Sequence, residues 1–424
     1  MGAAAFRIFA GMRVACILIL FLMALCQASS LNAQGLWRCD VDQRLANLWD
    51  AAKVGATEER LTAASGIVQL REPVIIPVVF HIVYRDPEQD ISDVQIRSQL
   101  DIINRDFGFE ADNLGAVPDM FYPLGGDAGL RFCLASVDPD GNPTSGITRT
   151  FTPVEHIGSD RQPNGRYSVH YNAYGGVDGW DPARYVNIWV AGLDGLLGTA
   201  SLPGMAAYPE EDGIVIDPNF VGSVGLAASA DPFDKGHTLT HELGHYFGLY
   251  HIWGQGNGSC DVDDMVDDTP EQEGPYLGCP EYPQFSCGSS DMFMNFMDFT
   301  SDRCLALFTR GQIARMQTAL MVMRPGLVEH PFACDTPDTG KIGLDDAIIY
   351  YASGSNQIIV ILGHENDPSH ELTIFSLDGK LIASRMWHTG RTYWIDADGL
   401  PAGIYAVRLE SGGEVLTQKV LVTP

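Results

Sequence analysis

The stretch His241-Glu-Leu-Gly-His-Tyr-Phe-Gly-Leu-Tyr-His251 has the spacing HExxHxxGxxH, in which two histidines stand four residues apart and a third follows a glycine. Residues four apart on an α-helix lie one turn apart on the same face, so His241 and His245 direct both imidazoles at one point. Gly248 permits a positive φ, which ends the helix and turns the chain so that His251 reaches the same point. The stretch therefore predicts a helix and a turn that bind one metal ion through three histidines.

The number of ligands and the glutamate between them indicate catalysis. Three protein ligands leave a fourth coordination position open for water, which distinguishes a catalytic zinc site from a structural one. Glu242 projects beside the histidines, where its carboxylate holds the zinc-bound water and not the metal. His237 lies just upstream and outside this spacing, so we interpret it as an ordinary core residue.

The region before the motif predicts an α/β domain. A β-branched run over 74–84 is long enough for a buried strand. Apolar residues at three- and four-residue spacing over 92–107 predict a helix that packs on that strand. Further strands are expected at 129–136, 185–191 and 213–216. Strand, helix and more strands before a second long helix indicate a mixed sheet.

From residue 340 the sequence has a different hydrophobic pattern. Short alternating strands are expected at 358–362, 371–376, 381–385, 405–409 and 415–422, separated by turn residues such as Asp378-Gly379. Residues 340–424 therefore predict a small all-β sandwich, within the size range of an independent domain.

The N-terminal region predicts an export signal. Two arginines precede an apolar run over 14–25, and small residues follow, so residues 1–33 have the pattern of a signal peptide. The run of roughly a dozen residues is short of the roughly 20 that a membrane-spanning helix needs. A lipid anchor at Cys26 is disfavoured because Leu25 stands where such a signal needs a small residue. We expect a mature protein without a transmembrane span.

A polar, helix-prone stretch without a core pattern follows and ends at Arg71-Glu72-Pro73, so we interpret residues 34–72 as a prosegment.

The charge balance argues against nucleic acid and anionic membranes as partners. The 424 residues carry 54 acidic and 26 basic side chains, with a formal net charge of −28. Such a chain repels nucleic acid and anionic membrane surfaces.

Beyond the histidine motif, residues 73–325 resemble the metzincins and, within them, the pappalysin-like metallopeptidases. The segments that carry the resemblance are 76–83, 134–135, 138–141, 146–149, 185–190, 267–270 and 295–298. The resemblance implies a metzincin-like catalytic domain over 73–332 with a mixed sheet, a zinc helix and a methionine turn. It also implies an endopeptidase that acts on protein or peptide substrates.

Metzincins place a methionine beneath the zinc ion, and Met297 follows the zinc helix in the expected order. Similar proteins often have tyrosine two residues later, where the hydroxyl approaches the metal. Phe299 stands there in this chain and has no hydroxyl. Stabilisation of the tetrahedral intermediate then falls to zinc, to backbone donors or to another residue.

The implied reaction is peptide hydrolysis by water that zinc activates, with Glu242 as the general base that later returns the proton to the leaving amine. Two other classes of function stay open at this point. One is a zinc-binding surface adhesin without catalysis, against which Glu242 argues. The other is a zinc hydrolase of non-peptide amides, because spacing alone does not fix the acyl substrate.

Export places the cysteines in an oxidising compartment. After removal of residues 1–33, seven remain: Cys39, Cys133, Cys260, Cys279, Cys287, Cys304 and Cys334. Four cysteines allow three pairings, and spacing does not choose among them. The resemblance implies the pairs Cys260–Cys287 and Cys279–Cys304, which tie the loop after the zinc helix to the methionine turn.

The odd number of cysteines leaves Cys39 to explain. A thiolate in the prosegment can occupy the open zinc position and exclude water until proteolysis removes it, which makes the precursor a latent zymogen. Cys133 and Cys334 are then free to pair. The alternative is a thiol that seeks a partner on another molecule.

Two further site predictions follow from the resemblance. The acidic loop 261–269 resembles the calcium loop of the family, with Asp264, Asp268 and Thr269 as ligands; a solvated acidic loop is the alternative. Arg303 stands where the family has the wall of the pocket for the residue after the scissile bond. A positive charge there disfavours basic substrate side chains, unless Arg303 is only a surface residue.

The C-terminal domain resembles the sorting domain of exported Bacteroidetes proteins, through the segment 400–405 and the end of the chain at 419–422. The resemblance implies the type IX secretion machinery as a partner and a secreted or cell-surface location after passage through the periplasm. The alternative is a carbohydrate-binding sandwich that uses Trp387, Tyr393 and Trp394.

Overall fold

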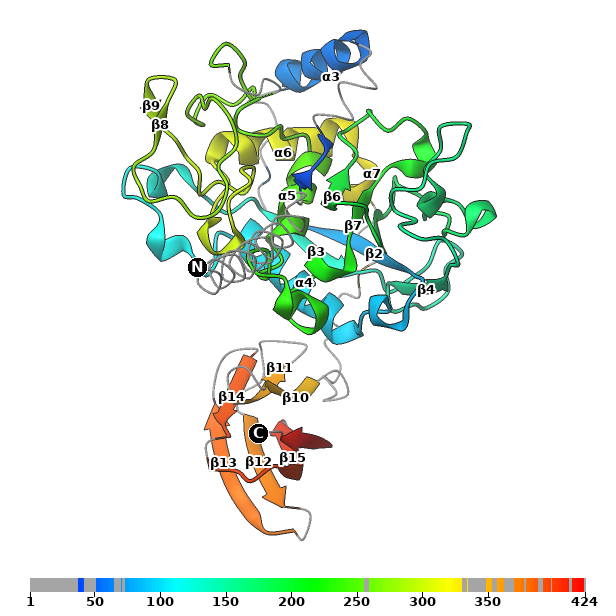
Figure 1. Cartoon of the computed structure of the whole chain (residues 1–424), viewed down its shortest axis with the longest axis vertical. Helices are drawn as coiled ribbons and strands as arrows, with labels where there is room; N and C mark the ends of the chain where they lie inside the picture. The colour runs from blue at the N-terminus through cyan, green and yellow to red at the C-terminus, as the bar shows by residue number, and fades with distance from the viewer. Residues whose placement is uncertain are drawn as a thin grey trace, which may run out of the picture. The chain divides into compact units, whose positions relative to one another are not determined.

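The computed structural model describes residues 37–41, 51–64, 70, 73–254, 259–329 and 334, and in the C-terminal region 348–352, 357–361, 370–376, 379–387, 392–397, 399–411 and 414–422. The predicted signal peptide, 1–33, and the other parts of the predicted prosegment lie outside these residues. The chain divides into two compact units, Met1–Asp335 and Thr336–Pro424 (Figure 1).

A seven-stranded mixed sheet forms the centre of the first unit. Its order is β1-β6-β7-β5-β2-β3, with β4 also paired to β2. The strands are β1 (Trp37–Cys39), β2 (Val74–Tyr84), β3 (Leu130–Leu134), β4 (Ile147–Phe151), β5 (Val186–Ala191), β6 (Leu196–Ala200) and β7 (Ile214–Ile216). All pairs are parallel except β6 with β7. The predicted mixed sheet is confirmed.

Strand β2 organises this sheet. Its β-branched residues are buried along almost the whole strand, as expected of a strand covered on both faces. It is long enough to pair with β3 and β4 one after the other along one edge, and with β5 along the other.

Helix α5, which carries His241 and His245, packs against strand β6 and helix α4 (Figure 1). The helices are α3 (Ala51–Ala64), α4 (Asp93–Phe107), α5 (His237–Tyr246), α6 (Arg310–Met323) and α7 (Gly326–Glu329). Helix α4 is the amphipathic helix that the sequence predicts. Its N-cap residue, Ser92, accepts a hydrogen bond from the amide of Gln95. The buried faces of α4, α5 and the sheet share one hydrophobic core.

Short 3-10 helices connect these elements: η1 (Pro87–Gln89), η2 (Leu114–Ala116), η3 (Tyr122–Leu124), η4 (Ser168–His170), η5 (Asn172–Tyr174), η6 (Pro209–Glu211), η7 (Pro218–Phe220), η8 (Gly225–Ser229) and η9 (Asp302–Cys304). A small hairpin of β8 (Phe285–Ser286) and β9 (Ser289–Ser290) lies in the loop before the methionine turn.

The second unit is all β. It has a three-stranded sheet, β10-β11-β14, and a four-stranded sheet, β13-β12-β15-β16, both antiparallel. The strands are β10 (Ile348–Ala352), β11 (Gln357–Ile361), β12 (His370–Ser376), β13 (Leu381–Trp387), β14 (Thr392–Asp396), β15 (Gly403–Ser411) and β16 (Glu414–Val422). Alternate residues of β15 are buried, namely Tyr405, Val407 and Leu409. The predicted all-β fold is confirmed.

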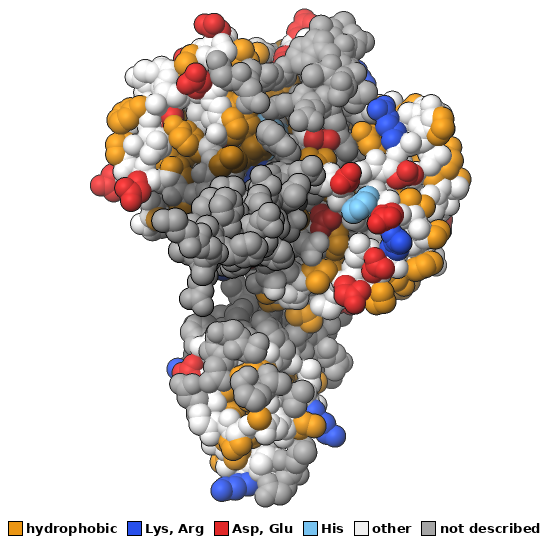
Figure 2. Space-filling view, viewed as in Figure 1, with side chains coloured by type: hydrophobic (Ala, Val, Ile, Leu, Met, Phe, Trp, Pro, Cys, Tyr) orange, Lys and Arg blue, Asp and Glu red, His pale blue; other side chains and the backbone are white. Residues whose placement is uncertain are grey.

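Two further features of the described residues concern the length of their helices and their surface charge. None of their helices is both long and apolar enough to cross a bilayer. Figure 2 shows Asp and Glu side chains gathered over part of the visible face of the first unit, in agreement with the net charge of −28.

Candidate functional site

Helix α5 and the turn after it bring the three motif histidines together. The helix ends at Tyr246, and Gly248 has a φ of 93° in the turn. The amide of Leu249 donates to the carbonyl of Gly244 at 2.9 Å, which closes the turn. This turn carries His251 back to the face of α5 that holds His241 and His245.

The three Nε2 atoms converge on one point. His245 Nε2 lies 3.1 Å from both His241 Nε2 and His251 Nε2, and these last two are 3.3 Å apart. Tetrahedral zinc with nitrogen ligands at its usual bond length separates those nitrogens by about 3.3 Å. All three histidines are fully buried. The arrangement of the donors fits a single zinc ion.

The protonation of the imidazoles also fits a metal. His241 Nδ1 lies 2.7 Å from the Phe296 carbonyl, and His245 Nδ1 lies 2.8 Å from the Leu249 carbonyl. A carbonyl only accepts, so each Nδ1 carries the proton and each Nε2 presents a lone pair to the centre. Burial, with His245 and His251 nearby, lowers the pKa of His241 well below its usual value, so the ring is neutral as a ligand must be.

Glu242 lies against strand β6. Its side chain is fully buried. A Cβ built on Gly198 of β6 would lie 3.0 Å from Glu242 Cγ and 3.1 Å from its Oε1. The strand therefore approaches the glutamate as closely as it does because position 198 has no side chain.

Cys39 completes a four-residue cluster. Its Sγ and one nitrogen from each of the three motif histidines lie within 4.8 Å of one another. Strand β1 pairs with β6 in parallel, and Cys39 stands opposite Gly198. The thiol donates a hydrogen bond to Glu242 Oε2 at 3.6 Å. Among the described residues, this is the group of side chains suited to a metal ion.

The methionine turn lies directly beneath α5. Met297 is fully buried, and a Cβ built on Gly244 of the helix would lie only 2.4 Å from its Sδ. The amide of Met297 donates to Asn295 Oδ1 at 2.9 Å. Burial raises the pKa of the neighbouring Asp298 to about 7, and its carboxylate accepts from the amide of Phe299 at 2.6 Å. These bonds fix the shape of the turn, and the contact of His241 Nδ1 with the Phe296 carbonyl joins the turn to the helix.

Phe299 supplies an aromatic wall to the site. Its ring centroid lies 4.8 Å from that of His251 and 5.7 Å from that of His241. Trp253 stacks on His251 at 4.5 Å and contacts Phe299 at 4.9 Å. The position that similar proteins fill with tyrosine is therefore apolar and packed around the third histidine.

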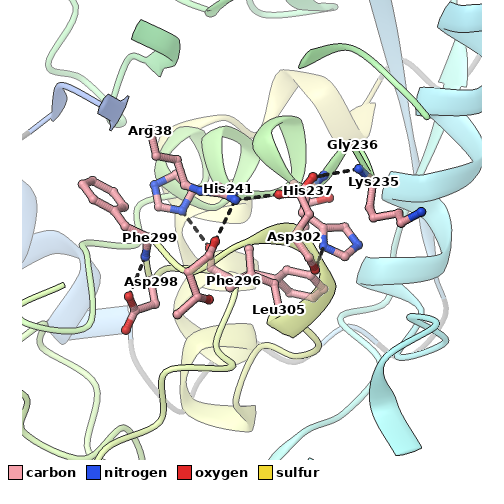
Figure 3. Close-up of polar contacts among 12 residues, drawn as sticks. Arg38, Lys235, Gly236, His237, His241, Phe296, Asp298, Phe299, Asp302 and Leu305 are labelled. Atoms are coloured by element: carbon pink, nitrogen blue, oxygen red, sulfur yellow. Dashed lines mark hydrogen bonds and ion pairs between the residues drawn. The ribbon is translucent and has the colours of Figure 1, made fainter. Parts of the chain in front are cut away.

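Arg38, which stands in the predicted prosegment, is buried and lies beside His241 (Figure 3). Arg38 Nη2 donates to Asp302 Oδ1 at 2.6 Å and to the Thr300 carbonyl at 2.9 Å. The exposed fractions of the Arg38 and Asp302 side chains are 1% and 0%. The guanidinium also lies over the Phe233 ring, 4.8 Å from its centroid. Asp302 is therefore the charged partner of a side chain that enters next to the metal ligands.

Asp302 is held in place from its other side by the start of α5. Its Oδ2 accepts from the amides of Lys235 at 2.9 Å and His237 at 3.3 Å. His237 Nδ1 lies 2.9 Å from the Asp302 carbonyl, so this buried histidine is a hydrogen-bonded core residue. The sequence does not reveal Asp302, because its partner Arg38 lies 264 residues away and neither residue belongs to a motif.

Arg303, the predicted pocket residue, has an exposed side chain. It stands in the short helix η9, next to the buried Asp302. Of these two neighbouring residues, the buried one is therefore the acidic Asp302.

Three disulfides join described cysteines of the first unit. They are Cys260–Cys287, Cys279–Cys304 and Cys133–Cys334. The first two are the pairs that the family resemblance implies, and the third is the pair left when Cys39 is set aside. Cys39 is buried and belongs to none of these three disulfides.

The three predicted calcium ligands do not all face one point. Asp264 is buried and accepts a hydrogen bond from Thr269 Oγ1 at 2.8 Å. Burial raises the pKa of Asp264 well above its usual value. Asp268 instead accepts from Thr309 Oγ1 at 2.6 Å and from the Gly311 amide at 2.8 Å, at the start of α6. The first amides of a helix have no acceptor within the helix, so they attract a carboxylate such as that of Asp268.

Two protein-family models match the chain. Residues 172–321 match the peptidase family described as pregnancy-associated plasma protein-A. Residues 354–423 match the secretion system C-terminal sorting domain. The first match contains the histidine motif and the methionine turn, and the second covers most of the all-β unit.

Curated relatives are extracellular metalloproteases of fungi. The chain is 36% identical over 180 residues to one from Arthroderma benhamiae, in a match that covers 40% of this chain and 60% of the relative. It is 29% identical over 289 residues to extracellular metalloprotease 1 of Coccidioides posadasii, which covers 65% of this chain and 85% of the relative. The chain thus spans 60% of the length of the first of these relatives.

Solved structures of one bacterial protein share the fold. A mutant of promirolysin from Tannerella forsythia superposes with a TM-score of 0.64 at 35% sequence identity, over 70% of this chain and 99% of that chain. Mature mirolysin from the same organism, in complex with a cleaved peptide, superposes with a TM-score of 0.59 at 39% identity, over 63% of this chain and 100% of that one.

Proposed function

Since this chain belongs to the pappalysin family of metallopeptidases, we propose that it hydrolyses peptide bonds with one zinc ion bound by His241, His245 and His251. The observation that carries the proposal is the convergence of three buried Nε2 lone pairs at 3.1 to 3.3 Å from one another. The buried Glu242 carboxylate accepts a hydrogen bond from Cys39, whose thiol lies in the same cluster. The mature mirolysin that resembles this chain holds a cleaved peptide, which supports peptides as the substrate class.

Zinc, Glu242 and the aromatic side chains have different roles in the proposed hydrolysis. Zinc, when bound, polarises the scissile carbonyl and acidifies a coordinated water. Glu242 takes the proton of the attacking water and returns it to the leaving amine. Its side chain packs against Gly198 of β6, and its carboxylate accepts from the Cys39 thiol. Phe299 and Trp253 keep the surroundings of His251 apolar, which strengthens every charge interaction in the site.

We also propose that the prosegment keeps the enzyme latent through Cys39. The thiol lies in the same four-residue cluster as the histidine nitrogens and donates to the general base, Glu242. A thiolate is a strong zinc ligand and would fill the coordination position that water needs. The pairing of β1 with β6 holds the thiol there.

We propose that Asp302 determines which substrate side chain the enzyme prefers. Arg38 of the prosegment already occupies the buried position beside this carboxylate, so a basic substrate side chain fits there once the prosegment leaves. This proposal and the Arg303 hypothesis predict opposite preferences. A library of quenched peptides should yield cleavage products enriched in Arg or Lys at one position, a preference that Asp302→Asn removes and Arg303→Ala leaves unchanged. Depletion of basic residues, reversed by Arg303→Ala, would support the Arg303 hypothesis instead.

The protein is secreted or displayed at the cell surface, as its sorting domain and its extracellular relatives indicate. We propose that the type IX secretion machinery exports it and that residues 1–33 are its signal peptide. The match over 354–423 favours sorting over carbohydrate binding as the role of the second unit. The side chains of Trp387, Tyr393 and Trp394 lie outside the described residues. Deletion of 354–423 should leave the protein inside the producing cell, which fractionation would detect.

The test of catalysis is hydrolysis of the peptide library by the chain after removal of its prosegment. We expect turnover that a chelator abolishes and added zinc restores. Glu242→Gln should keep the bound zinc, measured by metal analysis, and lower kcat/KM by about 10²- to 10⁴-fold. A wild-type chain that binds zinc and cleaves no peptide would instead support the zinc-binding adhesin.

A further inference from the structure

The prosegment contacts the catalytic unit at a second place, away from the metal ligands. Helix α3 lies on α6. Residues 54, 57, 58 and 61 form a stripe at helical spacing that is buried or partly buried, while Glu59 and Arg60 are exposed. The stripe is the face through which α3 binds.

Glu58 and Arg315 form the polar centre of this contact. Arg315 Nη2 lies 2.6 Å from Glu58 Oε1, and Arg315 Nη1 lies 3.0 Å from Glu58 Oε2, so the pair is bidentate. The Arg315 side chain is 10% exposed and the Glu58 side chain is 17% exposed. The hydroxyl of Tyr250 donates to the same Glu58 Oε1 at 2.9 Å. One carboxylate of the prosegment therefore accepts three hydrogen bonds from the catalytic unit.

The catalytic unit holds this site ready without the prosegment. Arg315 Nε donates to the Gly248 carbonyl at 2.7 Å, and its guanidinium lies 5.2 Å from the Tyr250 ring centroid. Both contacts lie within the catalytic unit, so they orient the guanidinium whether or not Glu58 is present. A guanidinium held in this way loses little freedom when it binds a carboxylate.

Apolar and backbone contacts extend the site around the ion pair. Leu61 is buried, and its Cδ1 lies 3.9 Å from the position of a Cβ on Gly248. Arg60 Nη2 donates to the Val322 carbonyl at 3.0 Å, near the end of α6, where the helix dipole favours a cation. On the catalytic unit, Gly248, the Val322 carbonyl and Arg315 therefore define a surface that fits a helix with a glutamate three residues before a leucine.

We propose that this surface, centred on Arg315 and Tyr250, is a binding site for α3 in its own right, and that it retains the prosegment after the chain is cut between α3 and β2. The proposal rests on the proposed function, because it concerns how latency ends. A cut at 65–69 leaves the prosegment attached through two separate contacts, one at Cys39 and one at α3. When one of these contacts breaks, the other keeps the peptide close to the enzyme, so the broken contact re-forms quickly. The peptide therefore departs only when both contacts are broken at the same time. Cutting and activation are then separate events.

The test uses the full chain with a recognition sequence for a site-specific protease at residues 65–69. After the cut, gel filtration and mass spectrometry measure how long the prosegment stays bound. The wild type should retain it. Glu58→Gln keeps the shape of the side chain and removes its charge, and should speed dissociation by about 10- to 100-fold. Glu59→Gln, at the exposed neighbouring position, should behave as wild type.

A second variant separates the contact from the stability of α3. Tyr250→Phe leaves the prosegment unchanged and removes one of the three donors, so dissociation should accelerate by about fivefold. Equal retention in the wild type and Glu58→Gln, or immediate loss from the wild type, would overturn the proposal. Retention is read by mass and needs no catalysis. If Glu58→Gln releases the prosegment faster and no variant cleaves peptide, the binding site stands and the peptidase proposal fails.

Discussion

Cys39 allows the proposed latency to be tested apart from catalysis, because its Sγ lies with the nitrogens of the three motif histidines in the described part of the chain. We expect the uncut Cys39→Ser chain to hydrolyse peptide at least about tenfold faster than the uncut wild type, since a serine hydroxyl is a much weaker ligand than a thiolate and leaves room for water. The measurement is initial hydrolysis, with electrophoresis to verify that the chain is intact.

The double variant Cys39→Ser with Glu242→Gln is the control, and it should be silent because it lacks the base. If intact Cys39→Ser is as inactive as the intact wild type, Cys39 is not the residue that blocks the site. The β1 strand would then maintain latency by its pairing with β6 alone.

Among single residues, the sequence identifies site residues whose partners are close along the chain. The three histidines are recognised because helical spacing and one glycine place them together within eleven residues. Arg38 and Asp302 escape recognition because a fold brings them together across 264 residues. The predicted pocket position, Arg303, is one residue from the buried acid, a difference that only the backbone of η9 determines.

Between elements, the closest approach in the site is that of α5 to the methionine turn. A Cβ at Gly244 would lie 2.4 Å from Met297 Sδ and 3.4 Å from a Phe308 ring carbon. We expect Gly244→Ala to lower the free energy of unfolding by about 1 to 3 kcal/mol, because the helix must move away from the turn. It should also weaken zinc binding, since His241 and His245 lie on that helix. Urea titration and metal analysis would measure both effects.

Gly55→Ala is the control for Gly244→Ala. A Cβ at Gly55 meets nothing within 4 Å and lies in the middle of α3, where alanine is the better helix former. Its stability should equal or exceed that of the wild type. An equal gain from both substitutions would mean that the contact between α5 and Met297 is not tight.

The loop 261–269 is the element in which we propose a calcium ion. Asp264 and Thr269 already lie together, and a buried carboxylate with a raised pKa gains most from a cation. Calcium should raise the Tm of the zinc-loaded chain, and Asp264→Asn should abolish the increase. The same Tm with calcium or with a calcium-selective chelator would favour a loop without an ion.

Elements with a strong internal pattern are predictable, and those that depend on distant pairing are not. Helix α4 and strand β2 follow directly from the spacing of their apolar residues. Strands β1 and β6 are absent from the predictions, because β1 has three residues and β6 contains Gly198. They form strands because they pair with each other and with β7, not because of their own propensity.

At the scale of the whole molecule, the two units should be separable at Asp335. The predicted end of the catalytic domain, residue 332, would remove Cys334 and leave Cys133 without its disulfide partner. We expect a chain that ends at 335 to unfold within about 2 °C of the first transition of the full chain. A chain that ends at 332 should lose about 2 to 5 kcal/mol. Calorimetry of the two truncations tests this boundary, and equal stabilities would contradict it.

Removal of the prosegment also changes the edge of the central sheet. Strand β1 covers β6, which is otherwise the last strand on that side, so its departure exposes a row of backbone amides and carbonyls next to Glu242. An exposed strand edge recruits extended peptide by strand addition. Under the proposed function, the chain without its prosegment should therefore bind stretches of substrate that are already unfolded, and the rate at which a folded target exposes such a stretch should limit how fast it is cut.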